Sequence, residues 1–247
     1  MTPKLTYKEN YKWLVFSVVA IGSITNVTHH GSVGIALPTI AEDFGVSLTT
    51  IQWVVLAETL TISVLLLPMG RLSDIIGRKP MYLAGIILFG LMSLLAGSAP
   101  SLASQLGSQR IMLFMIPLRV LQGLGAAMTQ ATGMAMVTTV FDDSERGKGL
   151  GAHGAIIGTG GVIGPILGGI LVTYLGWQWV FWINIPLCVL AFVATLLVLD
   201  TSLFRGTGSQ NNRYDWLGAI LSTVSLLTFL LTLSNGSQFG WTSYEIL

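Results

Sequence analysis

Three side chains that can carry charge, His29, Glu58 and Arg119, stand inside long apolar stretches of the sequence. A charge near the middle of a bilayer costs a few kcal/mol or more, so such a group normally faces a cavity or a partner. If these stretches are membrane helices, each residue lies about eight positions from the same end of its helix, roughly 12 Å deep. We therefore expect a Glu58–Arg119 ion pair with His29 beside it, lining a central polar cavity together with Gln122.

Such a cluster could couple proton binding to a change of conformation. Arg119 would hold Glu58 ionised, and protonation of Glu58 or His29 would alter the pair and favour one conformation. The alternative is a static ion pair that only lets two helices pack. For Gln122, a hydrogen bond between helices is the alternative to a place at the cavity.

Other chemistry has little support in the sequence. His29 and His30 are adjacent, and adjacent side chains of a helix point about 100° apart, which makes a poor chelating pair. The single cysteine, Cys188, excludes an internal disulfide and a cysteine-based metal site. No phosphate loop, metal-ligand spacing or nucleophile–base pair can be recognised, so we expect no enzyme, no metal and no cofactor. A net charge of +1 gives no reason to expect a nucleic-acid partner.

The elements that must hold these residues are transmembrane helices. Hydrophobic residues make up 52% of the chain and charged residues only 9%, whereas soluble domains carry about 25% charged residues. A helix needs about 20 apolar residues to cross the bilayer core. Seven stretches qualify, which predicts an all-α integral membrane protein: 13–37, 50–69, 81–99, 111–133, 151–174, 178–199 and 216–234.

The basic residues predict the orientation of these helices. With the N-terminus in the cytoplasm, ten of the twelve lysines and arginines fall on the cytoplasmic side, since only Arg110 is outside and Arg119 lies within a helix. Basic residues concentrate on the cytoplasmic side of membrane proteins. We therefore expect a multi-pass protein of the plasma or inner membrane. Its predicted divisions are a six-helix bundle at 1–200, a flexible cytoplasmic linker at 201–214, and a seventh helix with an outer tail at 215–247.

Two short segments carry patterns that the spans alone do not explain. The loop 70–80 reads GRLSDIIGRKP. Gly70 and Gly77 permit a tight turn, Asp74 can cap a helix or pair with a cation, and Arg78 and Lys79 anchor the loop at the headgroups. The stretch 151–174 contains glycines at steps of three or four, which predicts one face for close helix packing: Gly151, Gly154, Gly158, Gly161, Gly164 and Gly168.

The loop 70–80 resembles motif A of the major facilitator superfamily. The segment 119–127 resembles its motif B, and 158–169 (GTGGVIGPILGG) resembles its motif C, the antiporter motif, with the positions Gly158, Gly161, Gly164, Pro165, Gly168 and Gly169. The start of the stretch 216–234 is similar to the fourteen-helix drug:proton antiporter branch. The resemblance implies an N-terminal six-helix bundle of that family followed by one further helix.

The resemblance also implies roles for the motifs. The motif C face would meet the second half of a transporter and limit leakage, with ordinary small-residue packing as the alternative. Asp74 would hold the cytoplasmic side closed against a helix of that second half. The sequence departs from the family where an aspartate is usual in the first helix and His29 stands instead, while Glu58 replaces an uncharged residue. The segment Ser104 to Leu113 is an insertion for which we have no physical account.

The expected function is half of a secondary transporter. It would export small amphiphilic or cationic compounds, as in multidrug efflux, with protons as the coupling ion and by alternating access between two bundles. The chain would then need a separately encoded second half, a second copy, or else be a truncated inactive product. The alternative is a non-transporting membrane anchor or structural subunit docked to another membrane subunit.

Overall fold

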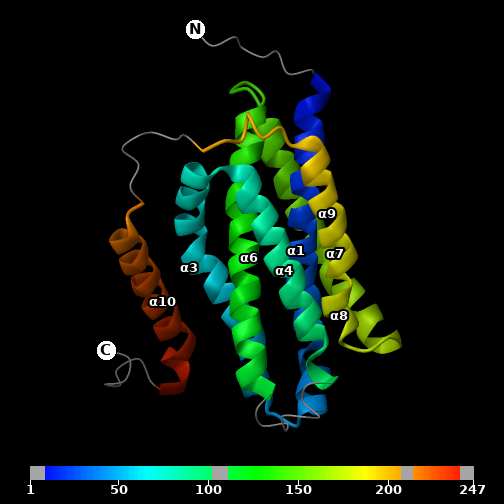
Figure 1. The fold of residues 1–247 in the computed structure, drawn as a ribbon. Coiled ribbons are helices and arrows are strands. Elements are labelled where there is room, and N and C mark those ends of the chain that lie inside the picture. The colour runs from blue at the N-terminus through cyan, green and yellow to red at the C-terminus, as the bar shows by residue number, and fades with distance from the viewer. Residues whose placement is uncertain (1–8, 102–110, 207–213, 240–247) are drawn as a thin grey trace.

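The computed structural model describes residues 9–101, 111–206 and 214–239, and the regular structure in these ranges is helical (Figure 1). Two short helices precede longer ones at one end of the bundle, α2 (Leu48–Ile51) before α3 and α8 (Trp179–Trp182) before α9. The long helices are α1 (Glu9–Phe44), α3 (Trp53–Ile76), α4 (Arg78–Gly97), α6 (Ile111–Val140), α7 (Arg146–Tyr174), α9 (Asn184–Val198) and α10 (Trp216–Phe239).

Six segments of the described chain are long and apolar enough to cross a membrane, and they correspond to six of the seven predicted spans. The remaining predicted span, 13–37, lies within α1, a 36-residue helix whose polar residues Asn26, His29 and His30 lower its hydropathy. α1 nevertheless packs lengthwise against α7, in the interior of the bundle. That α1 also crosses the bilayer stays a prediction, supported by this packing.

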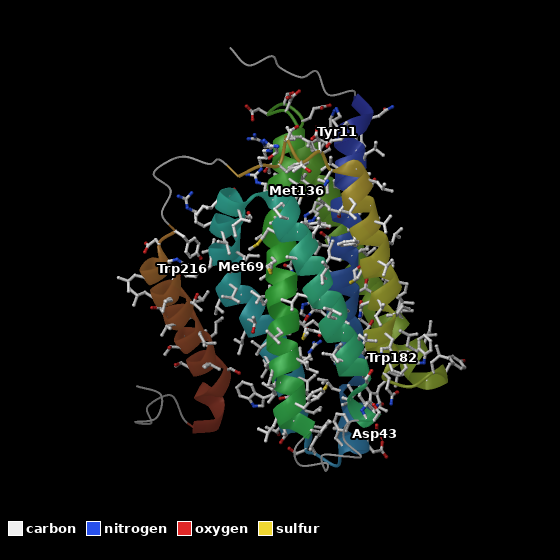
Figure 2. All side chains as sticks on the ribbon, in the orientation of Figure 1. Tyr11, Asp43, Met69, Met136, Trp182 and Trp216 are labelled. Carbon is white, nitrogen blue, oxygen red and sulfur yellow. The ribbon has the colours of Figure 1, made fainter. Side chains whose placement is uncertain are left out.

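Successive long helices run in alternating directions, so that their connections fall at two opposite ends (Figure 1). Figure 2 shows Tyr11 at one end and Asp43 at the other. We call the end near Tyr11 the basic end, because it carries the basic residues that the structure describes outside the spans, Lys12, Arg71, Arg78, Lys79, Arg146, Lys148 and Arg205. Lys4, Lys8, Arg110 and Arg213 lie outside the described residues. That the basic end faces the cytoplasm stays a prediction.

An ion pair fastens α1 to the start of α7 at the basic end. Lys12 Nζ donates to Glu145 Oε2 at 2.5 Å. This hydrogen bond, followed by the charges of Lys12 and Lys148, lowers the pKa of Glu145 below its ordinary value.

Two apolar clusters fill the bundle, one toward each end. One contains Val33, Ile51 and Met115 with Val180 and Phe181 of α8. The other contains Val19 and Tyr82 with residues from the last turns of α6. The middle sections of α1, α3 and α6 fall between the two clusters. The polar residues predicted to form a site therefore lie in a belt enclosed at both ends by apolar packing.

Glycines let α6 approach its neighbours closely in this belt. A Cβ atom at Gly123 would lie 2.7 Å from the carbonyl oxygen of Glu58 on α3, and one at Gly125 would lie 2.8 Å from that of Gly85 on α4. Real Cβ atoms do not approach so closely, so a larger residue at either position would push the helices apart. α6 is therefore held between α3 and α4 at the level of the polar residues.

α10 stands at the edge of the molecule beside α3 (Figure 1). The Tyr214 hydroxyl, just before α10, donates to the carbonyl oxygen of Pro68 at 3.3 Å. Within the predicted insertion, residues 104–110 lie outside the described part of the chain, and Ile111 begins α6.

Candidate functional site

The structure brings His29, Glu58 and Arg119 together from three different helices. Arg119 Nη2 and Glu58 Oε2 form an ion pair, and both side chains have an exposed fraction of 0%. His29 Nε2 lies 3.8 Å from Glu58 Oε2 and 2.7 Å from Arg119 Nη1. α1, α3 and α6 thus each contribute one ionisable group to a single contact.

The guanidinium of Arg119 organises this contact with several donors at once. Its Nε donates to the carbonyl oxygen of Val54 at 2.7 Å, and its Nη1 donates to Gln122 Oε1 at 2.6 Å. The guanidinium carbon also lies 5.4 Å from the ring centroid of Phe181. A planar guanidinium with fixed donors suits this arrangement in a way that a lysine ammonium would not.

The contacts of His29 determine which ring nitrogen can hold a proton. Arginine only donates hydrogen bonds, so the 2.7 Å contact requires His29 Nε2 to accept, and an imidazole with a free Nε2 is neutral. The Gln122 amide lies 3.1 Å from the same nitrogen, and the Asn184 amide lies 2.9 Å from Nδ1. A proton added to Nε2 would therefore break the contact with Arg119.

His29 lines an apolar pocket of about 260 Å³ together with Thr28 and Asn184, whereas Glu58, Arg119 and Gln122 lie enclosed between helices, so the predicted central polar cavity stays a prediction. His29 is 1% exposed, and Glu58, Arg119 and Gln122 are 0% exposed. α3 and α6 approach each other closely beside the Glu58–Arg119 pair, at Gly123. Gln122 instead joins helices, because its Nε2 donates to Ser93 Oγ on α4 at 2.6 Å.

An open cavity does exist nearer the basic end, between α1, α3, α6 and α7. Its volume is about 520 Å³, and Ser23, Val27, Leu66, Gln130 and His153 are among the residues that line it. His153 Nε2 lies 2.8 Å from Ser23 Oγ, so this histidine links α7 to α1 at the cavity wall. The polar cluster and the cavity are thus neighbours along the axis of the bundle.

Arg78 and Lys79 of the loop 70–80 bind backbone carbonyls of neighbouring helices rather than reaching only toward headgroups. Arg78 pairs with Asp74 at 3.2 Å, and its Nη1 donates to the carbonyl oxygen of Ala135 at 3.0 Å and to Thr139 Oγ1 on α6. Lys79 Nζ donates to the carbonyl oxygen of Leu199 at 2.5 Å. Leu199 is the C-cap of α9, and the last carbonyls of a helix lack partners within it and attract cations, which explains the contact of Lys79.

The two glycines of this loop have different surroundings. Gly77 has φ +113°, a conformation that favours glycine, and it ends α3. The next amide, that of Arg78, donates to the carbonyl oxygen of Phe204 at 2.9 Å. Gly70 lies inside α3, where a Cβ would make only an ordinary contact at 3.9 Å with Ala131, so the predicted tight turn applies to Gly77 alone.

We expect the substitution Arg78→Lys to reduce the free energy of unfolding by about 1–3 kcal/mol, because an ammonium lacks the planar fork that holds Asp74, Thr139 and the carbonyl oxygen of Ala135 at once. Unfolding in mixed micelles, followed by circular dichroism, measures the effect. Arg146→Lys is the matched control, because Arg146 pairs only with the 89% exposed Asp143 among the described ion pairs. Equal stability of the two variants would contradict the role given to Arg78.

The glycines predicted to form one packing face of α7 do not all contact a neighbouring helix, which corrects the prediction for this stretch. A Cβ at Gly164 would lie 2.8 Å from the carbonyl oxygen of Thr28, and one at Gly168 would lie 2.7 Å from Ser32 Cα on α1. Other glycines of the stretch have open space where a Cβ would be: Gly151, Gly154, Gly158, Gly161 and Gly169. Steps of three and four average less than the roughly 3.6 residues of a helical turn, so the row of glycines winds around the helix.

Pro165 belongs to the part of α7 that packs closely on α1. A Cβ at Gly31 would lie 2.7 Å from Pro165 Cδ. Ser32 Oγ donates to the carbonyl oxygen of Gly164 at 2.7 Å, so α1 and α7 are also hydrogen bonded at this crossing.

Several residues of the site were not predicted. Asn184 and Ser93 contact His29 and Gln122, and uncharged polar residues of this kind are too common in membrane helices to be recognised from sequence. His30 was considered only as a metal ligand, yet its Nε2 lies 3.8 Å from Glu58 Oε1. Its position next to His29 and inside an apolar stretch was the available signal.

Comparison with known proteins agrees with the motifs. The family model described as Major Facilitator Superfamily matches residues 19–245. The puromycin resistance protein pur8 of Streptomyces alboniger is 35% identical over 93% of this chain and 43% of its own length. The multidrug transporter protein MdtP of Bacillus subtilis is 31% identical over 97% of this chain and 42% of its own length. The riboflavin transporter RibZ of Clostridioides difficile is 31% identical over 90% of this chain and 46% of its own length.

The chain therefore spans about half the length of the curated relatives it matches. Two of these relatives are named as transporters, of riboflavin and of multiple drugs, and the third is named as an antibiotic-resistance protein, as expected for the drug:proton antiporter branch. The family model matches nearly the whole sequence, and six helices of the described residues are long and apolar enough to span a bilayer. This chain is therefore a multi-pass membrane protein that belongs to the major facilitator superfamily.

Proposed function

We propose that this chain forms one bundle of a proton-coupled exporter of small amphiphilic or cationic compounds, which works by alternating access. The observation that carries the proposal is the enclosed contact of Glu58, Arg119 and His29, made by three helices in the middle of the bundle. The substrate class is supported by the names of relatives, which include a multidrug transporter and a puromycin resistance protein.

Protonation of Glu58 would be the coupling step. A neutral carboxyl no longer pairs with Arg119, so the attraction that holds α3 to α6 at this level would be reduced. Arg119 would keep its bonds to the Val54 carbonyl and Gln122, which belong to the same two helices. The contact would thus have two arrangements, paired and unpaired, and binding of one proton would select between them. Coupling of proton movement to alternating access needs such a choice between two states.

The second bundle would pack on the open side of α7. Gly154, Gly158 and Gly161 present no Cβ there, so another helix could approach closely. We propose that this bundle comes from a second half of the transporter, and that the basic end faces the cytoplasm of a cell whose plasma or inner membrane holds the protein.

The experiment is transport by the assembly that contains this chain, reconstituted in proteoliposomes with ethidium, a lipophilic cation, as the probe. We expect Glu58→Gln to abolish ethidium accumulation driven by a pH gradient while leaving exchange of labelled for unlabelled ethidium at equal pH. The reason is that glutamine keeps the size of the side chain but cannot take up a proton.

Glu145→Gln is the matched control, because Glu145 is also a carboxylate paired with a cation but lies at the end of the bundle. It should retain accumulation driven by the gradient. If Glu58→Gln also retained it, the ion pair would be a static packing contact and the coupling role would be abandoned.

A further inference from the structure

One oxygen of the enclosed carboxylate is left without a hydrogen bond. Glu58 Oε2 belongs to the ion pair with Arg119, whereas Oε1 has no hydrogen-bond partner among the described residues. A histidine nitrogen, His30 Nε2, lies 3.8 Å from Oε1. This is slightly beyond hydrogen-bond distance, so a small rotation of the imidazole would bring the two atoms together.

His30 is also the member of this group whose side chain reaches the surface of the bundle. Its side chain is 27% exposed, while those of Glu58, Arg119 and His29 are 0% exposed. His30 lies three residues after Val27 on α1, so the two share a face of the helix. Val27 lines the 520 Å³ cavity, which places His30 about one turn beyond its wall.

His29 is less suited to deliver a proton. Its Nε2 accepts from Arg119 at 2.7 Å, so a proton can be added to this nitrogen only by breaking that contact. The charged groups that face His30 are Glu58 on α3 and, behind it, Arg119 on α6. On its own helix His29 is the neighbouring titratable group, with ring centroids 6.3 Å apart.

We propose that His30 is the proton relay between the aqueous cavity and Glu58. His30 takes a proton from water in the cavity, and its Nε2–H bond then breaks as an O–H bond forms at Glu58 Oε1. The products are a neutral imidazole and a neutral carboxyl beside Arg119, and release follows the reverse route. This inference rests on the proposed function, because it assumes that Glu58 exchanges a proton during transport.

The test measures protonation of Glu58 directly, by time-resolved infrared spectroscopy of the assembly in lipid vesicles after a rapid drop in pH. The carbonyl band of the protonated carboxyl is assigned as the band that Glu58→Gln lacks. We expect His30→Gln to slow the appearance of this band by at least about tenfold, because it removes the acid–base group on the route. His153→Gln is the matched control, since His153 is another histidine within a helix but bonds Ser23 instead.

Chemical rescue separates a relay from a structural role. In His30→Ala, free imidazole added to the buffer should restore the rate, because it can occupy the vacated space and carry the proton; in His153→Ala it should change nothing. A slow rate without rescue, or an unchanged rate in His30→Gln, would overturn the relay while leaving the coupling role of Glu58 intact. A spectrum in which Glu58→Gln removes no band would instead refute the proposed function itself.

Discussion

Replacing Arg119 with leucine should lower the free energy of unfolding by about 3–5 kcal/mol, the largest effect that we expect for a single residue. The substitution leaves Glu58 at 0% exposure without its cation, and a buried carboxylate must then remain unpaired or take up a proton. It also removes donors from the Val54 carbonyl and from Gln122. Reversible unfolding in mixed micelles, followed by circular dichroism, gives the difference.

The double variant Glu58→Leu with Arg119→Leu is the decisive comparison. Replacing a buried ion pair by apolar residues of similar volume is often neutral or stabilising, so we expect the double variant to recover most of the loss. Arg146→Leu serves as the control, because Arg146 is 48% exposed and its pair with Asp143 contributes little. If the double variant were as unstable as Arg119→Leu alone, the loss would not come from an unpaired Glu58.

The substitution Gly168→Ala should destabilise the protein by about 1–3 kcal/mol, the cost of adding a methyl group to a well-packed contact. Its Cβ would lie 2.7 Å from Ser32 Cα, where backbone rather than a mobile side chain must give way. α1 would be displaced from α7 at the crossing where Ser32 Oγ donates to the carbonyl oxygen of Gly164. The same unfolding measurement in mixed micelles detects the change.

The neighbouring substitution Gly169→Ala provides a close control. It adds the same methyl group one residue along the same helix, where nothing lies within 4 Å. We expect no loss of stability in this variant. If the two alanine substitutions changed the free energy of unfolding equally, the change would come from the alanine itself and not from the contact of Gly168 with α1.

The sequence predicted the helices better than it predicted their mutual packing. Apolar length is a property of each segment alone, so the sequence predicts seven spans directly. Six of them are long and apolar enough in the described structure, and the seventh, within α1, carries Asn26 and two histidines in its interior. Which glycines contact another helix depends on where the two helices cross. The spacing of Gly164 and Gly168 looked equivalent to that of Gly154 and Gly158, yet only the first two lie against α1.

Part of the site was predictable for a physical reason. An ionisable residue inside an apolar stretch is costly, so His29, Glu58 and Arg119 stood out and their common depth suggested a contact. Whether that contact is open or enclosed could not be predicted, because it depends on the close approach of α6 to α3 at Gly123. Partners such as Asn184 and Ser93 give no comparable signal, since a neutral amide or hydroxyl costs little in a helix.

The segment that follows α9 has a mechanical consequence. Phe204 is 1% exposed, its carbonyl oxygen accepts from the amide of Arg78, and Gly206 lies so close to Ile75 that no side chain would fit there. Residues 201–206 are thus fastened to the turn between α3 and α4, although composition predicted a flexible linker from 201 onward. Any tilt of that turn would therefore move residues 201–206 with it, because a hydrogen bond and close packing join the two segments.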